Sequence, residues 1–208
     1  MVQAIYPQPD QRRPLCEIET SLADGRAICL RTIRPSDEAR IREGISEMSD
    51  RSRYLRFFSA FREPPESVVK QLSAVDGHDH IGWGAILLDG HDFPPIAAAH
   101  AIRLDPASTL AELSIAVLDE FHGQGLARKL VAAVLVDCLA EGINCLEIHV
   151  LGENVPAARL VRSLGAKRDA TLDTVEHYRL DIAPTLANME KSDNDLGVTD
   201  ILQQMLVR

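Results

Sequence analysis

The alternation of hydrophobic and polar positions predicts a chain in which short strands and short helices follow one another. Strands are expected over residues 17–22, 27–33, 81–88, 96–104, 110–118, 145–151, 166–171 and 175–180, where apolar runs are bounded by turn residues. Helices are expected from Ser36, whose hydroxyl would cap the first turn, through Tyr54 and Phe57, and over 65–74, 125–141 and 156–164. These elements predict an α+β fold with a mixed, mainly antiparallel sheet and helices on both of its faces.

The two ends of the chain differ in pattern from the long segment between them. Residues 1–16 predict an N-terminal arm without the apolar core of a signal peptide, and residues 17–183 predict one domain. The tail, 184–208, loses the periodic pattern after Pro184 and contains a charged stretch, 190–195, that is typical of a solvated linker. Within the tail, residues 198–207 predict a short amphipathic helix with one apolar side, formed by Ile201, Leu202, Met205 and Leu206.

Composition and charge narrow the kinds of partner that fit this chain. The 208 residues are 46% hydrophobic and carry a net charge of -9, which argues against nucleic acid or an anionic membrane as the main partner. The longest uninterrupted apolar run, Leu130–Val136, is too short to cross a bilayer, so we expect a soluble, cytoplasmic protein. Four scattered cysteines without a metal-ligand spacing predict reduced thiols and no metal site: Cys16, Cys29, Cys138 and Cys145.

The most informative segment is the junction between the strand 110–118 and the helix that follows it. Its letters, FHGQGLA at 121–127, place Gly123 and Gly125 immediately before the helix. Unpaired amides and the positive end of the helix dipole attract phosphate there, and glycine lets the backbone approach a ligand closely. The spacing matches neither a P-loop nor a dinucleotide fingerprint, and two glycines before a helix are by themselves also compatible with a flexible loop.

The order of motifs around this loop resembles the acetyl-CoA-binding half of the GNAT acetyltransferase superfamily. The resemblance rests on AELSIAV at 111–117, on the glycine loop, and on Glu153-Asn154 with the helix that ends at Gly165. In the family's pattern of Gln/Arg-x-x-Gly-x-Gly/Ala, the last two positions match here, whereas His122 departs from the first. The resemblance implies a GNAT fold and acetyl-CoA as co-substrate, held by Ile115, Val117, His122, Gly123, Gln124, Gly125, Leu126, Ala127, Asn154 and Ala157. For Asn154, the alternative is an N-cap of the following helix, and both interpretations can hold at once.

Transfer of an acyl group to an amine needs a base, because alkyl amines are protonated at neutral pH. The resemblance assigns this role to Glu112 and assigns polarisation of the thioester carbonyl to the strand's backbone, with the Val117 amide as first candidate. An apolar strand would desolvate Glu112 and raise its pKa; the alternative is an ion pair with Arg103. Glu147 and His149 are reserve candidates for the base.

The proton donor of the family is missing from this sequence. The family's usual tyrosine is replaced by Val161. Either water or another group then protonates the leaving thiolate, or the thiolate leaves without being protonated. Tyr178 is a candidate for the donor, but the sequence does not show where it lies relative to the thioester.

The front half of the chain, including the cluster 52–58, resembles the acetyltransferase domain of bacterial protein-lysine acetyltransferases. The primary amine is therefore expected to be a protein lysine; a small amine such as a polyamine, and a non-catalytic acyl-CoA sensor, remain as alternatives. A homodimer is also compatible with the sequence.

Overall fold

The computed structural model describes residues 16–59, 61–89, 92–191 and 197–206. In these residues eight strands form one sheet in the order β1-β2-β3-β4-β5-β6-β8-β7. The strands are β1 (Ile18–Ser21), β2 (Ala27–Thr32), β3 (His80–Leu87), β4 (Pro95–Arg103), β5 (Leu110–Val117), β6 (Cys145–Leu151), β7 (Lys167–Leu172) and β8 (Val175–Asp181). Neighbouring strands run antiparallel, except that β5 and β6 run parallel. The predicted mixed and mainly antiparallel sheet is thus confirmed, with strand bounds close to the expected ones.

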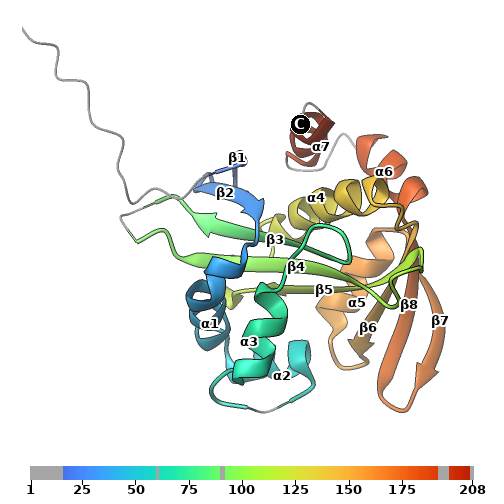
Figure 1. Cartoon of the computed structure of the whole chain (residues 1–208), viewed down its shortest axis with the longest axis horizontal. Coiled ribbons are helices and arrows are strands. Elements are labelled where there is room, and N and C mark those ends of the chain that lie inside the picture. Colours follow the sequence, from blue (N-terminus) through green and yellow to red (C-terminus); the bar gives the residue numbers. More distant parts are fainter. Residues whose placement is uncertain (1–15, 60, 90–91, 192–196, 207–208) are drawn as a thin grey trace, which may run out of the picture.

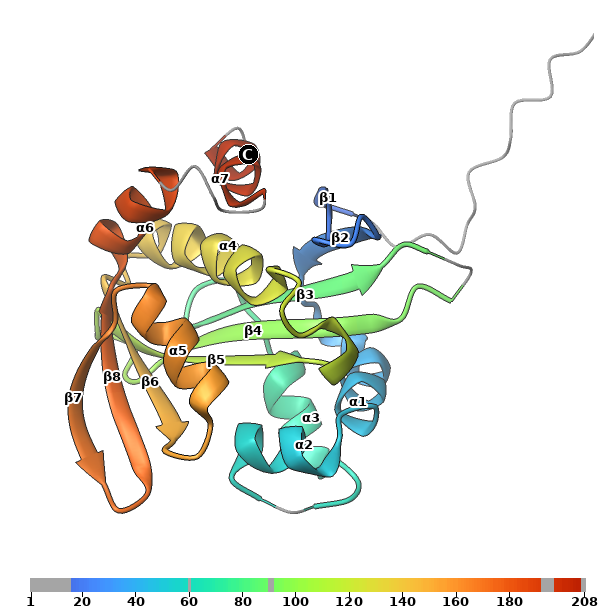
Figure 2. The ribbon, with the colours of Figure 1, turned by 180° about the vertical axis from the view of Figure 1, so that it is seen from behind.

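Helices cover both faces of the sheet (Figures 1 and 2). One face, which we call the α1–α3 face, carries α1 (Glu38–Ser46), α2 (Asp50–Phe57) and α3 (Glu66–Ser73). The opposite α4 face carries α4 (Leu126–Ala140), α5 (Val155–Ser163), α6 (Ile182–Lys191) and α7 (Val198–Leu206). Within the described part of the chain, no helix is long and apolar enough to cross a membrane.

The helix α4 is buried around most of its circumference. Lys129, Ala132, Ala133 and Leu135 are buried as well as Leu130 and Val134, because α6 and α7 pack against the outer side of the helix. The tail thus closes the core, and the side chains of α7 that do so are Val198, Ile201, Leu202 and Met205. The side chain of Leu206 and all of residue 207 lie outside the described residues.

The helix α6 was not predicted, because Pro184 was interpreted as the end of regular structure. Pro184 is the third residue of α6. Proline is tolerated in the first turn of a helix, where its missing N–H would have had no partner. Of the expected linker 190–195, residues 190 and 191 belong to this helix, and 192–195 lie outside the described residues.

The start of α1 also differs from the prediction in its cap. Ser36 lies in a short 3-10 turn, Pro35–Asp37, and makes no cap; the carboxylate of Asp37 accepts a hydrogen bond from the Arg34 amide at 2.8 Å instead. The same carboxylate pairs with the Arg31 guanidinium at 2.6 and 2.8 Å in a buried ion pair. This pair ties the helix layer to strand β2.

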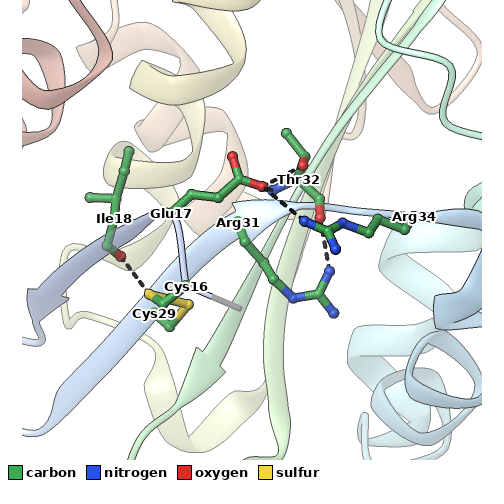
Figure 3. Close-up of a disulfide and its surroundings, with 7 residues drawn as sticks. All are labelled: Cys16, Glu17, Ile18, Cys29, Arg31, Thr32 and Arg34. Atoms are coloured by element: carbon green, nitrogen blue, oxygen red, sulfur yellow. Dashed lines mark hydrogen bonds and ion pairs between the residues drawn. A yellow bond between two sulfur atoms is a disulfide. The ribbon is translucent and has the colours of Figure 1, made fainter. Parts of the chain in front are cut away.

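The prediction of four reduced cysteines was wrong for two of them. Cys16 and Cys29 form a disulfide, with their Cα atoms 5.5 Å apart, at the edge of the β1–β2 hairpin (Figure 3). The hairpin brings the two residues together although they are separated by 13 positions. Cysteine spacing alone does not reveal such pairing across strands. Cys138 and Cys145 are free thiols.

Candidate active site

The parallel strands β5 and β6 are paired only at one end. Their register joins Leu110 to Cys145, Ala111 to Leu146 and Glu112 to Glu147, and no pair follows in the described residues. On its other side β5 stays paired with β4 through Val117. The sheet therefore opens between β5 and β6 beyond Glu112, as Figure 2 shows.

The open edge of β5 presents backbone amides that no strand uses. Leu118 N donates to Ile96 O at 3.0 Å, and Leu110 O accepts from Leu104 N at 3.2 Å, so the even-numbered residues of β5 bond to β4. Because successive backbone groups of a strand point in opposite directions, the N–H groups of odd-numbered residues point into the opening. The amides concerned are those of Ile115 and Val117, which lie beyond the last pair with β6.

The glycine loop lies at the end of this open edge and begins α4, as the sequence predicted. Gly123 and Gly125 have φ values of 74° and 78°, a left-handed conformation that favours glycine. A Cβ at Gly123 would meet no atom within 4 Å, so the backbone there faces open space. Gly125 is the N-cap of α4, whose first amides have no partner within the helix. This arrangement fits a pyrophosphate.

Two polar side chains of the loop hold it in place and do not project from it. His122 Nε2 donates to Val117 O at 3.0 Å. Gln124 Oε1 accepts from the amide of Asp24 at 3.1 Å, which fastens the loop to the β1–β2 turn. Leu126, which was also predicted to contact the cofactor, has its side chain buried in the core. At Gln124 and Leu126, contact with a ligand would therefore come from the backbone.

The helix α5 forms the opposite wall of the opening. Asn154 is its N-cap, and the side-chain oxygen accepts from Ala157 N at 3.2 Å. The amide NH₂ group of Asn154 remains a donor, so capping and cofactor binding are compatible. Arg128, in the first turn of α4, donates to Ser163 Oγ at 3.0 Å and links the two helices. The sequence analysis did not single out this cation beside the loop.

Glu112 stands on the α1–α3 face where the strands part. Its Oε2 lies 3.8 Å from Nδ1 of His149, whose ring centroid is 4.4 Å from that of His177. The Glu112 side chain is 46% exposed, so the desolvation expected from the sequence is modest. The alternative ion pair with Arg103 is not formed: Arg103 donates to Asp79 at 3.0 Å.

The other candidates from the sequence have different surroundings. Glu147 is paired with Arg179 at 3.1 Å. Tyr178 is buried on the opposite face of the sheet from Glu112 and donates to Glu176 at 2.5 Å. Burial and this carboxylate raise the pKa of Tyr178, which makes it a poorer proton donor. Val161, at the family's tyrosine position, is buried.

An arginine that was not among the predicted site residues lies beside Glu112. Arg56 Nη2 donates to Ser114 Oγ at 2.7 Å, which places a guanidinium two residues along β5 from Glu112. Burial lowers the pKa of Arg56 to about 10, and the Glu112 carboxylate opposes this shift. The signal available in the sequence was a charged residue within the aromatic cluster of α2.

The helix α2 is fastened to both edges of the opening. At one edge, Asp119 accepts from the hydroxyls of Ser52 at 2.7 Å and Ser49 at 3.0 Å. At the other edge, Arg51 pairs with Glu153 at 2.9 Å, immediately before Asn154. The α2 helix therefore connects the loop before α4 with the loop before α5.

The strand geometry separates two roles that the sequence analysis had combined. Val117 lies five residues from Glu112 along β5, which corresponds to about 17 Å at a rise of about 3.3 Å per residue. A base acts within hydrogen-bond reach of the amine or through a water, so Glu112 and the Val117 amide cannot serve one thioester. The Ile115 amide is about 10 Å along the strand from Glu112, within reach of a side chain and a bridging water.

The sequence of this chain is similar to those of known acetyltransferases. Residues 38–166 match the sequence model of the acetyltransferase (GNAT) family. The chain belongs to the GNAT family. "Acetyltransferase Pat" of Mycolicibacterium smegmatis is 30% identical over 149 residues, covering 72% of this chain and 44% of that protein. The L-2,4-diaminobutyric acid acetyltransferase of Streptomyces coelicolor is 33% identical over 101 residues, covering 46% of this chain and 56% of that protein.

Solved structures of GNAT proteins share the fold. The GNAT domain of S. lividans PAT superposes with a TM-score of 0.73 at 24% identity, covering 79% of this chain and 96% of that one. The spermidine N-acetyltransferase from Vibrio cholerae, solved with CoA and spermine, gives 0.60 at 16% identity, covering 76% and 98%. The chain spans about half the length of the curated relatives it matches. In the described residues, no cluster of three or more His, Cys, Asp or Glu side chains has the arrangement of a metal site.

Proposed function

We propose that this protein transfers an acetyl group from acetyl-CoA to a primary amine, and that the amine is a lysine side chain of a protein. The observation that carries the proposal is the open edge of β5, which has a glycine loop and a helix N-terminus at one end and Glu112 at the other. One extended ligand with a phosphate at one end and a thioester at the other fits this order.

In this proposal each part of the coenzyme meets a different part of the opening. The amides of residues 123–127 hold the pyrophosphate, and Asn154 and the Val117 amide hold the pantetheine arm. The Ile115 amide donates to the thioester oxygen and stabilises the negative charge that develops there. Backbone donors are already oriented, so they need no reorganisation during the reaction.

Glu112 would remove one proton from the ammonium group of the acceptor through a water. The amine nitrogen then bonds to the carbonyl carbon, the carbon–sulfur bond breaks, and the coenzyme leaves as a thiolate. Because Val161 has no proton to give and Tyr178 lies on the other face, we assign protonation of the thiolate to water, which passes on the second proton that the nitrogen loses as the amide forms. His149, at 3.8 Å, would orient the Glu112 carboxylate.

The charges near Glu112 favour an acceptor with a single amine over a polyamine. In the described part of this region, the neighbouring carboxylate of Glu147 is already paired with Arg179, and Arg56 adds a positive charge. A polyamine carries several ammonium groups and needs several carboxylates, whereas a lysine side chain presents one. The exposed side chains of Tyr54 on α2 and of Phe58 just after this helix would contact the surface that carries the lysine.

The test is incubation with radiolabelled acetyl-CoA, in parallel with a bacterial protein extract and with a panel of polyamines, amino sugars and diamino acids. Label on discrete protein bands, absent with Glu112→Gln, is the expected result. Label on small amines alone would reject the protein acceptor and leave the transfer reaction in place. Coenzyme binding without any labelled product would identify a non-catalytic acyl-CoA-sensing protein.

A further inference from the structure

A cavity of about 90 Å³ lies between the helices of the α1–α3 face and strands β2 to β5. For comparison, a single water needs about 10–15 Å³. Small residues on both sides create this space, namely Gly44, Gly84, Ala85, Ala97, Ala98 and Ala116. Larger apolar side chains from α1, α2 and α3, such as Ile45, Phe57 and Leu72, line the rest of the wall. The cavity can therefore hold an apolar group of several atoms.

The cavity and Glu112 lie on the same face of the sheet, on opposite sides of the contact between Arg56 and Ser114. Ala116 lines the cavity and pairs with Ala98 of β4, and it directly follows Ile115 in the chain. Arg56 also lines the cavity and binds Ser114. An acyl group at the Ile115 amide would thus have the cavity next to it, beyond Ala116 on the α1–α3 face, and Glu112 three residues earlier on the same strand.

The charged groups around the cavity exclude an amine as its occupant. Three guanidinium groups line it, those of Arg31, Arg40 and Arg56, against the single carboxylate of Asp37. Asp37 is already paired with Arg31, and Arg40 donates to Phe93 O at 2.7 Å. A protonated amine in the cavity would be surrounded by apolar walls and repelled by the excess positive charge. A hydrocarbon chain would contact the same apolar walls without burying a charge.

We propose that this cavity receives the acyl chain of the donor, and that the protein accepts acyl-CoA thioesters longer than acetyl. The proposal rests on the function proposed above. The chemistry is unchanged: the amine bonds to the carbonyl carbon, the carbon–sulfur bond breaks, and coenzyme A is released. Only the length of the transferred hydrocarbon chain differs.

The experiment measures binding of unreactive coenzyme A thioethers, so that no acceptor is needed. Isothermal titration calorimetry compares coenzyme A with its S-ethyl, S-butyl and S-hexyl thioethers on the full chain. Burial of each methylene is expected to tighten binding by about fourfold until the cavity is full.

Two variants locate the effect. Ala98→Leu fills the cavity and should remove the dependence on chain length while leaving the affinity for coenzyme A within about twofold. Ala107→Leu makes the same change at an exposed position outside the cavity and should bind every thioether as the wild type does. If Ala98→Leu melts far below the wild type, Ala116→Val makes a smaller change in the same wall.

The outcomes separate the two proposals. Tight binding of coenzyme A with equal affinity for all thioethers overturns the acyl cavity and leaves the proposed function in place. An affinity that rises with chain length equally in Ala98→Leu, Ala116→Val and the wild type also overturns the acyl cavity alone. Failure of coenzyme A itself to bind overturns the proposed function and the cavity proposal with it.

Discussion

The two sides of strand β5 differ in how completely the backbone is paired. Toward β4, residues 111–117 pair one by one with residues 97–103, whereas toward β6 only three pairs form. A buried amide without a partner costs about 1–3 kcal/mol, so an unpaired edge persists only where water or a ligand can reach it. The paired side therefore builds stability, and the open side leaves donors for a ligand.

Two histidine pairs also differ between the paired side and the open side of β5. On the paired side, His80 Nε2 and His100 Nδ1 are 2.9 Å apart in the buried layer. On the open side, His149 and His177 are half-buried and lie beside Glu112. The same residue type thus serves packing on one side of β5 and is available for chemistry on the other.

The largest effect is expected on the paired side, from the buried ion pair of Arg31 and Asp37. Asp37→Asn leaves the Arg31 guanidinium without its charged partner and should lower the free energy of unfolding by about 3–5 kcal/mol. Urea denaturation at pH 7 measures this. The control is Glu66→Gln, which removes the partner of Arg42 in an exposed pair and should cost less than about 1 kcal/mol. Equal losses in the two variants would contradict the assigned role.

The same pair predicts how stability changes in acid. Burial raises the pKa of Asp37, but hydrogen bonds from Arg31 and from the Arg34 amide outweigh it, and the pKa is lowered from 3.8. The unfolded chain then binds the proton more readily than the folded protein. The contribution of Asp37 is present above pH 3.8 and is lost as the pH falls through the folded-state value. Asp37→Asn should lack this part of the pH dependence.

The next largest effect is expected on the open side, from Gly125→Glu. A carboxylate and a Cβ at the N-terminus of α4 would repel the phosphates, and coenzyme A affinity should fall at least about 100-fold, or about 2.8 kcal/mol. Gly142→Glu is the matched control, since Gly142 has a φ of 75° just beyond the other end of the same helix. Both variants carry the backbone strain, but only Gly125→Glu should lose binding in calorimetry. A folded Gly125→Glu protein with wild-type affinity would exclude the loop as the phosphate site.

A smaller effect is expected for the base. Glu112→Gln should lower kcat by at least about tenfold, the low end of what a positioned base contributes, because water can partly replace it. Coenzyme A affinity should not change. Glu147→Gln removes the carboxylate directly opposite on β6, which is paired with Arg179, and should retain kcat within about twofold. Measuring kcat of both variants with any acceptor found by labelling decides between the two carboxylates. Full activity of Glu112→Gln would show that Glu112 has a structural role.

The sequence predicted the open side better than the paired side, because the former is built from backbone. Glycine spacing before a helix determines local conformation directly, so the loop at 123–127 could be found without tertiary information. The alternating strands were likewise found with nearly correct bounds. By contrast, the α6 helix, the Cys16–Cys29 disulfide and the burial of α4 on its outer side depend on contacts between distant segments.

The side chains around the opening were predicted less completely, because their positions also depend on contacts between distant segments. Glu112 stood out as an acid in an apolar strand, whereas Arg56 lies in another helix and joins the site through a contact with Ser114, 58 positions away. The family pattern favours the Val117 amide as the carbonyl contact, whereas the proposal based on the rise of the strand uses the Ile115 amide. Distances of this kind follow from three-dimensional structure and not from spacing in the sequence.

The smallest effect is expected on the paired side, from the response of the buried pair His80 and His100 to pH. Burial, with the nearby charges of His80 and Arg56, holds the pKa of His100 well below 6.5, and burial also lowers that of His80 despite the Ala74 carbonyl and Asp76. Between pH 6.5 and the folded-state values, the unfolded chain binds protons that the folded protein does not, so stability falls as the pH falls. One such group contributes at most about 1.4 kcal/mol per pH unit.

We therefore expect urea denaturation at pH 7 and pH 5.5 to show a smaller difference in stability for His100→Gln than for the wild type. An unchanged difference in His100→Gln would show that the buried pair is not the group that titrates.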